Sequence, residues 1–235
     1  MRISKTGSGN PKVAFVACVH GDEKIGEKAI EKLKNIRLAG GTLFFVLANE
    51  KAAQENKRFT ESDLNRVFPG NPEGDHEEKL AHQLLHELRQ ADVVIDIHST
   101  EADTEDFIIL TKKEQFRIAE KVPIEKCVFM EKSIAKGKAL IDHVNLGISI
   151  EFNKDRGDVS GILRQILINL GMVKGRKRIA SQVGYSVYGI IEKKDYSGLL
   201  VNFRETEING ELFFPLFYGS KNYENVACLK ARRVR

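Results

Sequence analysis

Two histidines and a glutamate in this chain have the types and the placement to bind a metal ion. His20 and Glu23 lie in the segment AFVACVHGDEKIG, and His98 lies in VVIDIHST. Each histidine ends an apolar, strand-like run, and the carboxyl ends of strands in an open α/β sheet form the crevice where ligands bind. Two imidazoles and one carboxylate are a recurrent catalytic zinc set, because they leave a fourth position open for water. The sequence therefore predicts one zinc ion per chain, bound by these three residues.

An ordinary turn is the alternative explanation for the first pair. Residues three apart share a face of a helix or a tight turn, so His20 and Glu23 can reach one ion. Gly21 would equally suit a turn after the strand, and Asp22 or Glu23 would suit the N-terminus of a following helix. His98 favours the metal site, because it follows VVID without a turn residue and supplies a second strand-end histidine.

Alternating apolar runs and helical repeats predict the scaffold that would position these residues. Strands are expected at 13–19, 42–48, 92–98, 107–110, 126–130 and 146–152. Helices are expected at 25–36, 77–88, 112–122 and 161–170. Strands that alternate with helices are typical of a parallel or mixed sheet covered on both faces. The predicted fold class is therefore α/β.

The composition changes after about residue 182. β-branched and aromatic residues become frequent, and the pairs YG, SG and NG interrupt them. We expect residues 1–182 to form the catalytic domain and residues 183–235 to form a small C-terminal β-domain. Most of the aromatic residues of the second segment should then belong to its core.

The overall charge and cysteine content indicate a protein that binds neither nucleic acid nor a membrane. Across 235 residues the net charge is +4 with both signs interspersed, and the basic run at 174–178 lacks the aromatic residues of a nucleic-acid surface. No apolar stretch is long enough for a signal peptide or a membrane span, and three scattered cysteines suggest no disulfide framework. We expect a cytoplasmic protein, and a homo-oligomer is left open.

A second polar cluster lies between the two predicted metal strands, in KRFTESDLNRVFPGNP. It contains Arg58, Asp63, Asn65 and Arg66. Two guanidiniums and an amide beside a metal would suit a small-molecule substrate that carries a carboxylate, because a guanidinium binds a carboxylate through a two-bond fork. By composition alone, the segment is equally an ordinary polar loop.

Glu151 is a candidate for proton transfer beside the predicted metal site. It closes the predicted strand LGISIE at the edge where His20 and His98 emerge. A carboxylate close to a metal-bound water could take a proton from it and pass the proton on. A glutamate at a strand end is otherwise a common surface residue, so its position alone does not decide its role.

Four segments in order give the chain a resemblance to a known family. VHGDE, SDLNRVFPG, DIHST and ISIE resemble motifs of the aspartoacylase and succinylglutamate desuccinylase family, a branch of the zinc carboxypeptidase superfamily. The resemblance covers residues 13–152, with a weaker match at FPLFYGSKNYE. It implies a zinc-carboxypeptidase-like mixed sheet flanked by helices, with the small β-domain over the mouth of the active site.

The resemblance also implies roles for the residues that match the motifs. Glu151 would be the general base, and Arg58 would polarise the carbonyl of the scissile bond. Asn65 and Arg66 would hold the α-carboxylate of the substrate. Tyr223 would line the substrate pocket, for which Tyr218 is an alternative.

One departure from the family pattern concerns the substrate. Aspartoacylases have a further arginine shortly before the catalytic glutamate, which contacts the side-chain carboxylate of the substrate, and KGKALIDHVNLG contains no arginine. Lys136, Lys138 or His143 would have to replace it, and a lysine is a point charge without the fork of an arginine. The acyl group and the amino acid are therefore left open.

Residues and resemblance together predict a zinc-dependent hydrolase that cleaves the amide bond of a small N-acyl amino acid. The alternatives are a metallocarboxypeptidase that acts on peptides and a non-catalytic binding or regulatory relative. A binding module needs no positioned base, so the presence of Glu151 beside all three ligands favours an enzyme. His82 and His86 lack the glutamate of the helical metalloprotease motif, and with His76 they are expected to face solvent.

Overall fold

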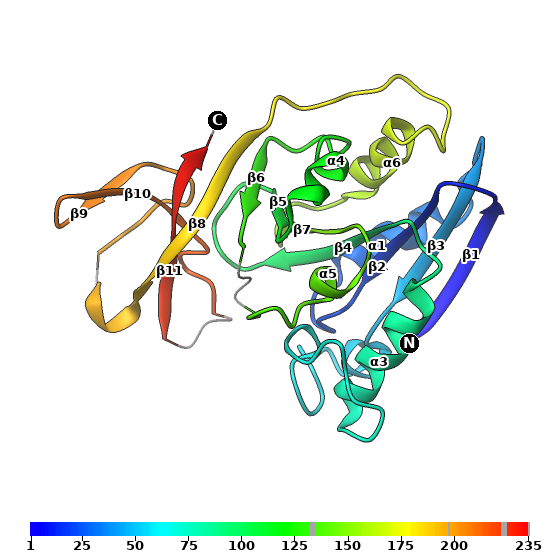
Figure 1. Ribbon diagram of the computed structural model, residues 1–235, viewed down its shortest axis with the longest axis horizontal. Coiled ribbons are helices and arrows are strands. Elements are labelled where there is room, and N and C mark those ends of the chain that lie inside the picture. Colours follow the sequence, from blue (N-terminus) through cyan, green and yellow to red (C-terminus); the bar gives the residue numbers. More distant parts are fainter. Residues whose placement is uncertain (132–134, 197, 222–224, 235) are drawn as a thin grey trace.

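A long sheet forms the centre of the molecule (Figure 1). The computed structural model describes residues 1–131, 135–196, 198–221 and 225–234. Within these residues the strands form one 11-stranded sheet in the order β1-β3-β2-β4-β7-β5-β6-β8-β11-β10-β9. The strands are β1 (Arg2–Ser8), β2 (Lys12–Ala17), β3 (Gly41–Leu47), β4 (Val93–Thr100), β5 (Phe107–Leu110), β6 (Lys126–Phe129), β7 (Gly147–Asn153), β8 (Val183–Glu192), β9 (Thr206–Ile208), β10 (Glu211–Leu216) and β11 (Val226–Val234).

Short helices connect these strands. The α-helices are α1 (Ile25–Leu33), α2 (Glu50–Gln54), α3 (His76–Leu88), α4 (Phe116–Ala119), α5 (Leu140–His143) and α6 (Ser160–Asn169), and the 3₁₀ helices are η1 (Leu64–Arg66), η2 (Lys113–Gln115) and η3 (Lys193–Asp195). The helix expected at 112–122 is thus wrong in extent, since only η2 and α4 form there. Among the described residues, every helix is too short or too polar to cross a membrane.

A block of four parallel strands lies in the sheet, and an antiparallel pair borders it on each side; β5, β6 and β8 then run parallel to one another. β3, β2, β4 and β7 run parallel to one another, whereas β1 is antiparallel to β3 and β5 is antiparallel to β7. The sheet is therefore mixed, as the sequence predicts. In this register Ala17 of β2 lies opposite Ile97 of β4, and His98 of β4 lies opposite Glu151 of β7. The carboxyl ends of β2, β4 and β7 consequently meet at one edge.

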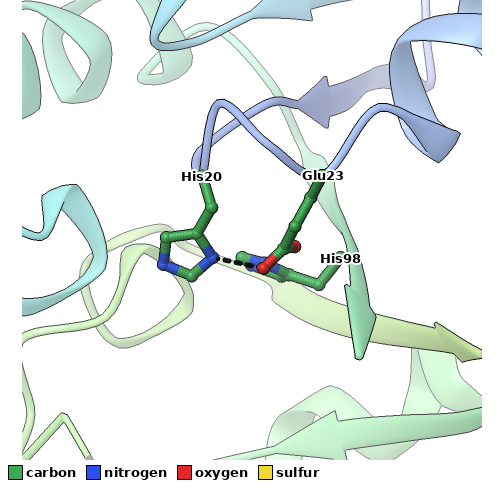
Figure 2. Close-up of side chains that lie close together, drawn as sticks. All are labelled: His20, Glu23 and His98. Carbon is green, nitrogen blue, oxygen red and sulfur yellow. Dashed lines mark hydrogen bonds and ion pairs between the residues drawn. The ribbon is translucent and has the colours of Figure 1, made fainter. Parts of the chain in front are cut away.

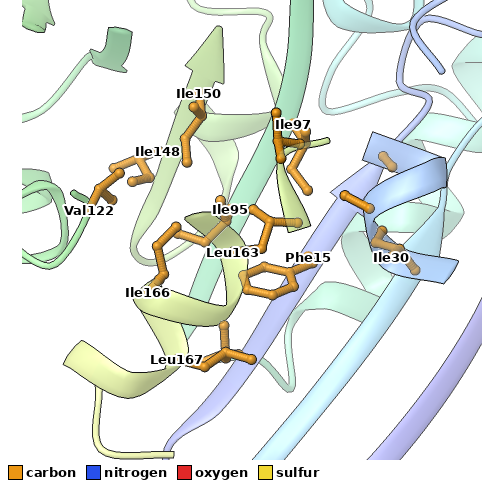
Figure 3. Close-up of a cluster of buried hydrophobic side chains, with 14 of the residues drawn as sticks. Phe15, Ile30, Ile95, Ile97, Val122, Ile148, Ile150, Leu163, Ile166 and Leu167 are labelled. Carbon is orange, nitrogen blue, oxygen red and sulfur yellow. The ribbon is translucent and has the colours of Figure 1, made fainter. Parts of the chain in front are cut away.

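Helices cover the central strands on both faces, because those strands are apolar on both sides. Val13, Phe15 and Ala17 of β2 belong to one core cluster with residues of α1 and α6. Ala14 and Val16, which point to the opposite face, belong to a second cluster with residues of α3. Figure 3 shows the first cluster, in which Phe15 lies between α6 and α1. Burial on both faces holds the strand ends in a fixed position.

α3 begins where the sequence supplies a capping box. Asp75 Oδ1 accepts a hydrogen bond of 2.9 Å from the backbone N–H of Glu78, and Glu78 Oε2 accepts one of 2.9 Å from the backbone N–H of Asp75. These bonds satisfy N–H groups that the first turn of a helix leaves unpaired. Leu80, Leu84 and Leu88 then form the apolar stripe that packs on the sheet.

The strands that follow residue 182 extend the same sheet. β8 runs parallel to β6, and β11, β10 and β9 follow it with antiparallel pairing. Aromatic rings join these strands to β5, since Phe107 lies 5.3 Å from Phe203 and 5.1 Å from Phe217 between ring centroids. Tyr185 of β8 lies 5.0 Å from Phe203. The division of the chain into two domains at residue 183 stays a prediction.

β1 is a strand that the sequence pattern does not reveal. Its residues RISKTGS show no regular apolar alternation, and most of its side chains are exposed. It pairs with β3 along its whole length, from Arg2 opposite Leu47 to Ser8 opposite Gly41. Backbone hydrogen bonds to an apolar neighbour, and not burial of its own side chains, place this strand at the edge of the sheet.

Gly26 sets how closely α1 approaches the sheet. A Cβ atom at this position would lie 2.8 Å from Ala17 Cβ and 2.9 Å from Ile97 Cγ2. We expect Gly26→Ala to lower the free energy of unfolding by about 1 to 3 kcal/mol, because overpacking forces neighbouring atoms apart. The matched control is Gly161→Ala in α6, where an added Cβ meets nothing within 4 Å and stability should be unchanged or slightly higher. Urea unfolding measures both, and equal losses would contradict the close packing.

Candidate metal centre and active site

The turn after β2 and the end of β4 bring three potential ligands together (Figure 2). His20 follows β2, Glu23 lies in the turn that leads to α1, and His98 lies on β4. Cys18 begins the turn with a φ of 55°, and the backbone N–H of Glu23 donates to the carbonyl of His20 at 3.2 Å. Gly21 fits the turn because any Cβ there would lie 2.3 Å from the backbone of α2. The tight turn places His20 and Glu23 on the same side.

The carboxylate of Glu23 lies between the two imidazoles. Its Oε1 is 2.8 Å from Nδ1 of His20, and its Oε2 is 3.0 Å from Nδ1 of His98. The two ring centroids are 5.0 Å apart, and all three side chains are buried. One potential ligand atom from each residue lies within 4.8 Å of the others. The structure thus brings together the three residues whose spacing suggested a metal site.

Two further carboxylates hold the far sides of the imidazoles. Nε2 of His20 lies 3.1 Å from Asp63 Oδ1, and Nε2 of His98 lies 2.8 Å from Asp96 Oδ2. Asp96 is fully buried in β4, where its Oδ2 also accepts a hydrogen bond of 3.4 Å from Ser149 Oγ. A carboxylate behind a ligating histidine fixes the ring orientation and the tautomer and makes the other nitrogen a better ligand. Both Nδ1 atoms are therefore presented to the same place.

The charges of this cluster depend on one another. Burial lowers the pKa of His98, but the charges of Asp96 and Glu23 outweigh it, so that the pKa lies well above its ordinary value. Burial also lowers the pKa of His20, but the neighbouring carboxylates of Glu23 and Asp63 raise it by more. The pKa of His20 is therefore above its ordinary value. For Glu23, burial raises the pKa, but the two imidazoles hold it well below its ordinary value. Positive charge at the imidazoles, from protons or from a cation, therefore balances the buried carboxylates.

The donor set fits a divalent metal ion. It offers two imidazole nitrogens and one carboxylate, and each ring is oriented by a second carboxylate. His20, Glu23 and His98 also line a cavity, so that a small molecule could reach an ion held there. Three protein ligands with an accessible remaining position distinguish catalytic metal sites from closed structural ones.

The loop between α2 and α3 carries the predicted substrate-binding residues to this cavity. Arg58 donates from Nη1 to Glu23 Oε1 at 3.3 Å and from Nε to Asp63 Oδ2 at 3.2 Å. Asn65 lies in η1, and its Oδ1 accepts a hydrogen bond of 2.9 Å from the backbone N–H of Leu140. This bond orients the amide, whose Nδ2 group can donate hydrogen bonds to a ligand.

Glu151 and Arg66 also line the cavity. Burial raises the pKa of Glu151 to about 7. The charge of His98 lowers this pKa, and the charge of Glu23 raises it further. A carboxyl group with a pKa in this range can take up and release a proton near neutral pH. A cation bound nearby would lower that pKa and favour the ionised form. Arg66 follows in η1, where its Nη1 donates to the carbonyl of Asn65 at 2.9 Å.

A buried glutamate on α3, which was not among the residues predicted from the sequence, holds the loop that carries Arg58 and Arg66. The carboxylate of Glu77 accepts hydrogen bonds from the backbone N–H groups of Thr60, Glu61 and Ser62, at 2.7, 3.0 and 3.2 Å. The Thr60 hydroxyl and the Asn49 amide donate to it as well, at 2.7 and 2.9 Å. Burial would raise the pKa of Glu77, but these hydrogen bonds lower it to about 2. The loop that carries the cavity arginines is therefore anchored to α3.

Other residues considered from the sequence are placed differently. Tyr223 lies outside the described residues. Tyr218 donates its hydroxyl to a backbone carbonyl at 2.8 Å and does not line the cavity. Lys136, Lys138 and His143 are exposed and do not line it either. The described part of the cavity thus contains no replacement from these three for the additional family arginine.

The histidines of α3 lie away from the cavity. His82 and His86 are exposed, as the sequence predicts. His76, for which solvent exposure was also expected, is only partly exposed, and its Nε2 atom is buried. The prediction for His76 is therefore wrong, because the first residue of α3 packs against the loop that Glu77 anchors, where its backbone N–H donates to Glu61 Oε2 at 3.0 Å.

The segment that builds the cavity matches one protein family. The family model described as succinylglutamate desuccinylase/aspartoacylase catalytic domain matches residues 9–157, which is more than half of the chain. The chain belongs to this family. An N-alpha-acetyl-L-2,4-diaminobutyric acid deacetylase from Halomonas elongata is 34% identical over 105 residues, which cover 41% of this chain and 30% of that protein. A probable aspartoacylase from Acaryochloris marina is 30% identical over 125 residues, which cover 46% and 41%. The chain thus spans less than half the length of these relatives.

Solved structures of the family share the fold over nearly the whole chain. Murine aminoacylase 3 matches with a TM-score of 0.71 and 21% identity, covering 97% of each chain. A succinylglutamate desuccinylase from Chromobacterium violaceum matches with a TM-score of 0.70 and 17% identity, covering 97% of this chain and 86% of that one. At these identities the likeness concerns the fold alone. The predicted family and the mixed α/β sheet flanked by helices are confirmed.

Metal uptake tests the candidate centre directly. We expect the wild-type chain, supplied with zinc and then desalted, to retain about one ion, because its rings are already oriented. His98→Ala should reduce the metal content to background, whereas the matched control His82→Ala, at an exposed position on α3, should not change it. Elemental analysis gives the ratio of metal to protein. Equal metal content in the two variants would contradict the assignment of His98 as a ligand.

The anchoring role of Glu77 predicts a particular pH dependence of stability. A carboxyl group with a depressed pKa in the folded chain stabilises the fold above its unfolded pKa and loses that contribution as the pH falls. Here the contribution should be complete above about pH 5 and decline toward pH 2. Glu77→Gln leaves an N–H₂ group facing backbone N–H donors, so we expect a loss of about 3 kcal/mol at neutral pH.

Urea unfolding of wild type and Glu77→Gln at several pH values between 7 and 3 measures this difference. The difference in the free energy of unfolding between the two proteins should shrink as the pH is lowered. The matched control is Glu87→Gln, near the other end of α3, whose difference from wild type should stay small at every pH. A constant difference between wild type and Glu77→Gln would show that the charge of Glu77 does not matter.

Proposed function

We propose that this protein is a zinc-dependent hydrolase that cleaves the amide bond of a small N-acyl amino acid to a carboxylate and a free amine. The observation that carries the proposal is one cavity that is lined by the three candidate metal ligands together with Glu151, Arg58, Asn65 and Arg66. Family membership and the names of the relatives, an aspartoacylase and a deacetylase, support this class of reaction.

Zinc is the metal that the donor set suits, since imidazole and carboxylate are its common catalytic ligands. When bound by His20, Glu23 and His98, it would supply a Lewis acid for the scissile carbonyl and lower the pKa of a water molecule. The chain contributes the orientation of the two rings through Asp63 and Asp96. It also contributes the burial that strengthens electrostatic interactions in the cavity.

Glu151 moves the proton in this proposal. Its carboxylate takes a proton from the attacking water and later returns it to the nitrogen of the leaving amine. Its place on β7, directly opposite His98 of β4, puts it on the strand next to a metal ligand. Burial, which raises its pKa to about 7, makes its carboxylate a stronger base toward water than an ordinary glutamate.

The arginines and the amide bind and polarise the substrate. Arg58 is held beside Glu23 by two carboxylates, and its guanidinium would stabilise the negative charge that develops on the carbonyl oxygen. Arg66 and the Nδ2 group of Asn65 would hold the carboxylate of the substrate through charge-assisted hydrogen bonds. Tyr223 is assigned to the substrate pocket by the family resemblance alone.

The variant Glu151→Gln tests the reaction and the base together. It keeps the size of the side chain and removes its ability to accept a proton, so we expect kcat to fall by about 10²- to 10⁴-fold while the zinc content is unchanged. Glu120→Gln, at an exposed position, is the control. Amine release from a panel of N-acetyl amino acids, with dipeptides assayed in parallel, measures both. Cleavage of peptides without deacylation would replace the proposal with a carboxypeptidase.

A further inference from the structure

One side of the cavity is apolar and takes no part in the proposed reaction. Its apolar lining comes from β5, from the segment that follows β6, from α5 and the residues before it, and from the turn after β10. We name this surface the apolar wall, and it consists of Ile109, Met130, Ala135, Ala139, Ile141 and Phe217.

The apolar wall is packed from behind. Ala135, Ala139 and Ile141 form one hydrophobic cluster, against which Ile109 packs. Met130 belongs to a neighbouring cluster that connects β5, β6 and the C-terminal strands. Apart from Ile109, every side chain of the wall is more than nine-tenths buried. Residues packed in this way keep their positions when a ligand arrives, so the wall is a preformed surface.

No lysine or arginine belongs to the apolar wall among the residues that the structure describes. The cavity arginines are Arg58 and Arg66, and the first of these already serves two carboxylates. Lys136 and Lys138 are exposed, and Nε2 of His143 lies 2.9 Å from a backbone carbonyl outside the cavity. The described lining can therefore match one carboxylate of a substrate through Arg66, and it presents no cation to a second one.

As far as the structure describes it, the wall also offers no partner to a positive charge. Apart from Glu23 and Glu151, which belong to the metal centre and the proposed proton transfer, the described lining contains no acidic residue. A charged group placed against the wall would lose its hydration without gaining a hydrogen bond or a counter-charge. An aliphatic group has no such cost, and it removes the apolar wall from water.

We infer that the substrates of this chain carry a single carboxylate and an uncharged aliphatic group that occupies the apolar wall. The inference rests on the proposed function and specifies its substrate class. The aliphatic group belongs either to the side chain of the amino acid or to the acyl chain, since both extend from the scissile amide. The relatives are named for aspartate and for 2,4-diaminobutyrate, whose side chains are charged. If the aliphatic group is the side chain of the amino acid, the substrate inferred here differs from both in the charge of that side chain.

Binding to the zinc-loaded Glu151→Gln variant tests the inference without turnover. Isothermal titration calorimetry compares N-acetyl-leucine, N-acetyl-aspartate and N-acetyl-2,4-diaminobutyrate, which differ in side-chain charge. A second series keeps alanine as the amino acid and compares its acetyl, butyryl and succinyl derivatives, which separates the acyl chain from the side chain. We expect the aliphatic member of at least one series to bind about 10-fold or more tightly than its charged counterparts.

Variants of the apolar wall provide the second readout. Met130→Lys introduces a cation, so the preference should shift by at least about 10-fold toward N-acetyl-aspartate or the succinyl derivative, while the matched control Met130→Leu keeps the wild-type order. If Met130→Lys does not fold, Ile109→Lys with its control Ile109→Val gives the same comparison at a less buried position.

The outcomes separate this inference from the proposed function. Tighter binding of aliphatic ligands without hydrolysis by the wild type would support the ligand class inferred for the cavity and reject the proposed reaction. Equal or tighter binding of the charged ligands, with hydrolysis, would overturn the inference and leave the reaction standing. Absence of binding by every ligand in both series would overturn the inference as well.

Discussion

A carboxylate removed from water needs partners, and that of Glu23 draws them from three separate parts of the chain. His20 and Arg58 contact its Oε1, at 2.8 and 3.3 Å, and His98 contacts its Oε2 at 3.0 Å. The backbone N–H of Ser99 donates to the same Oε2 at 2.9 Å. These contacts tie the turn after β2 to β4 and to the loop before α3. The candidate metal ligands and the loop that carries Arg58 are therefore parts of one buried network, in which the loss of one member leaves another without its partner.

Much of this arrangement could be predicted from the sequence. Long apolar runs identify β2, β4 and β7, because strands of a parallel sheet are buried on both faces and contain few polar residues. The first polar residues at the ends of such runs then gather at one edge of the sheet. The strand ends alone select His20 and His98, whereas the role predicted for Glu151 also needs the family resemblance. The short spacing between His20 and Glu23 then indicated the third candidate metal ligand.

The rest could not be predicted, because it depends on contacts between distant parts of the chain. Glu77 and Asn49 are 28 positions apart, and nothing in the spacing of α3 indicates which loop its glutamate would meet. One signal was available, since Glu77 lies on the same helix face as Leu80 and Leu84, where an acidic residue requires buried partners. Asp96 was equally hidden within an apolar strand. β1 has no apolar pattern and forms only because β3 presents unpaired backbone groups.

The two outer strands of the sheet differ in how they limit association with other chains. β1 carries Arg2 and Lys5 and is mostly exposed, whereas β9 has only 3 residues. An exposed strand edge can recruit a strand from another molecule, and charged side chains or a very short edge discourage this. An open sheet of 11 strands has both edges to protect. The features that discourage association at the sheet edges therefore lie in strands that do not line the cavity. Replacing Lys5 in β1 with an apolar residue would favour self-association without changing any residue of the cavity.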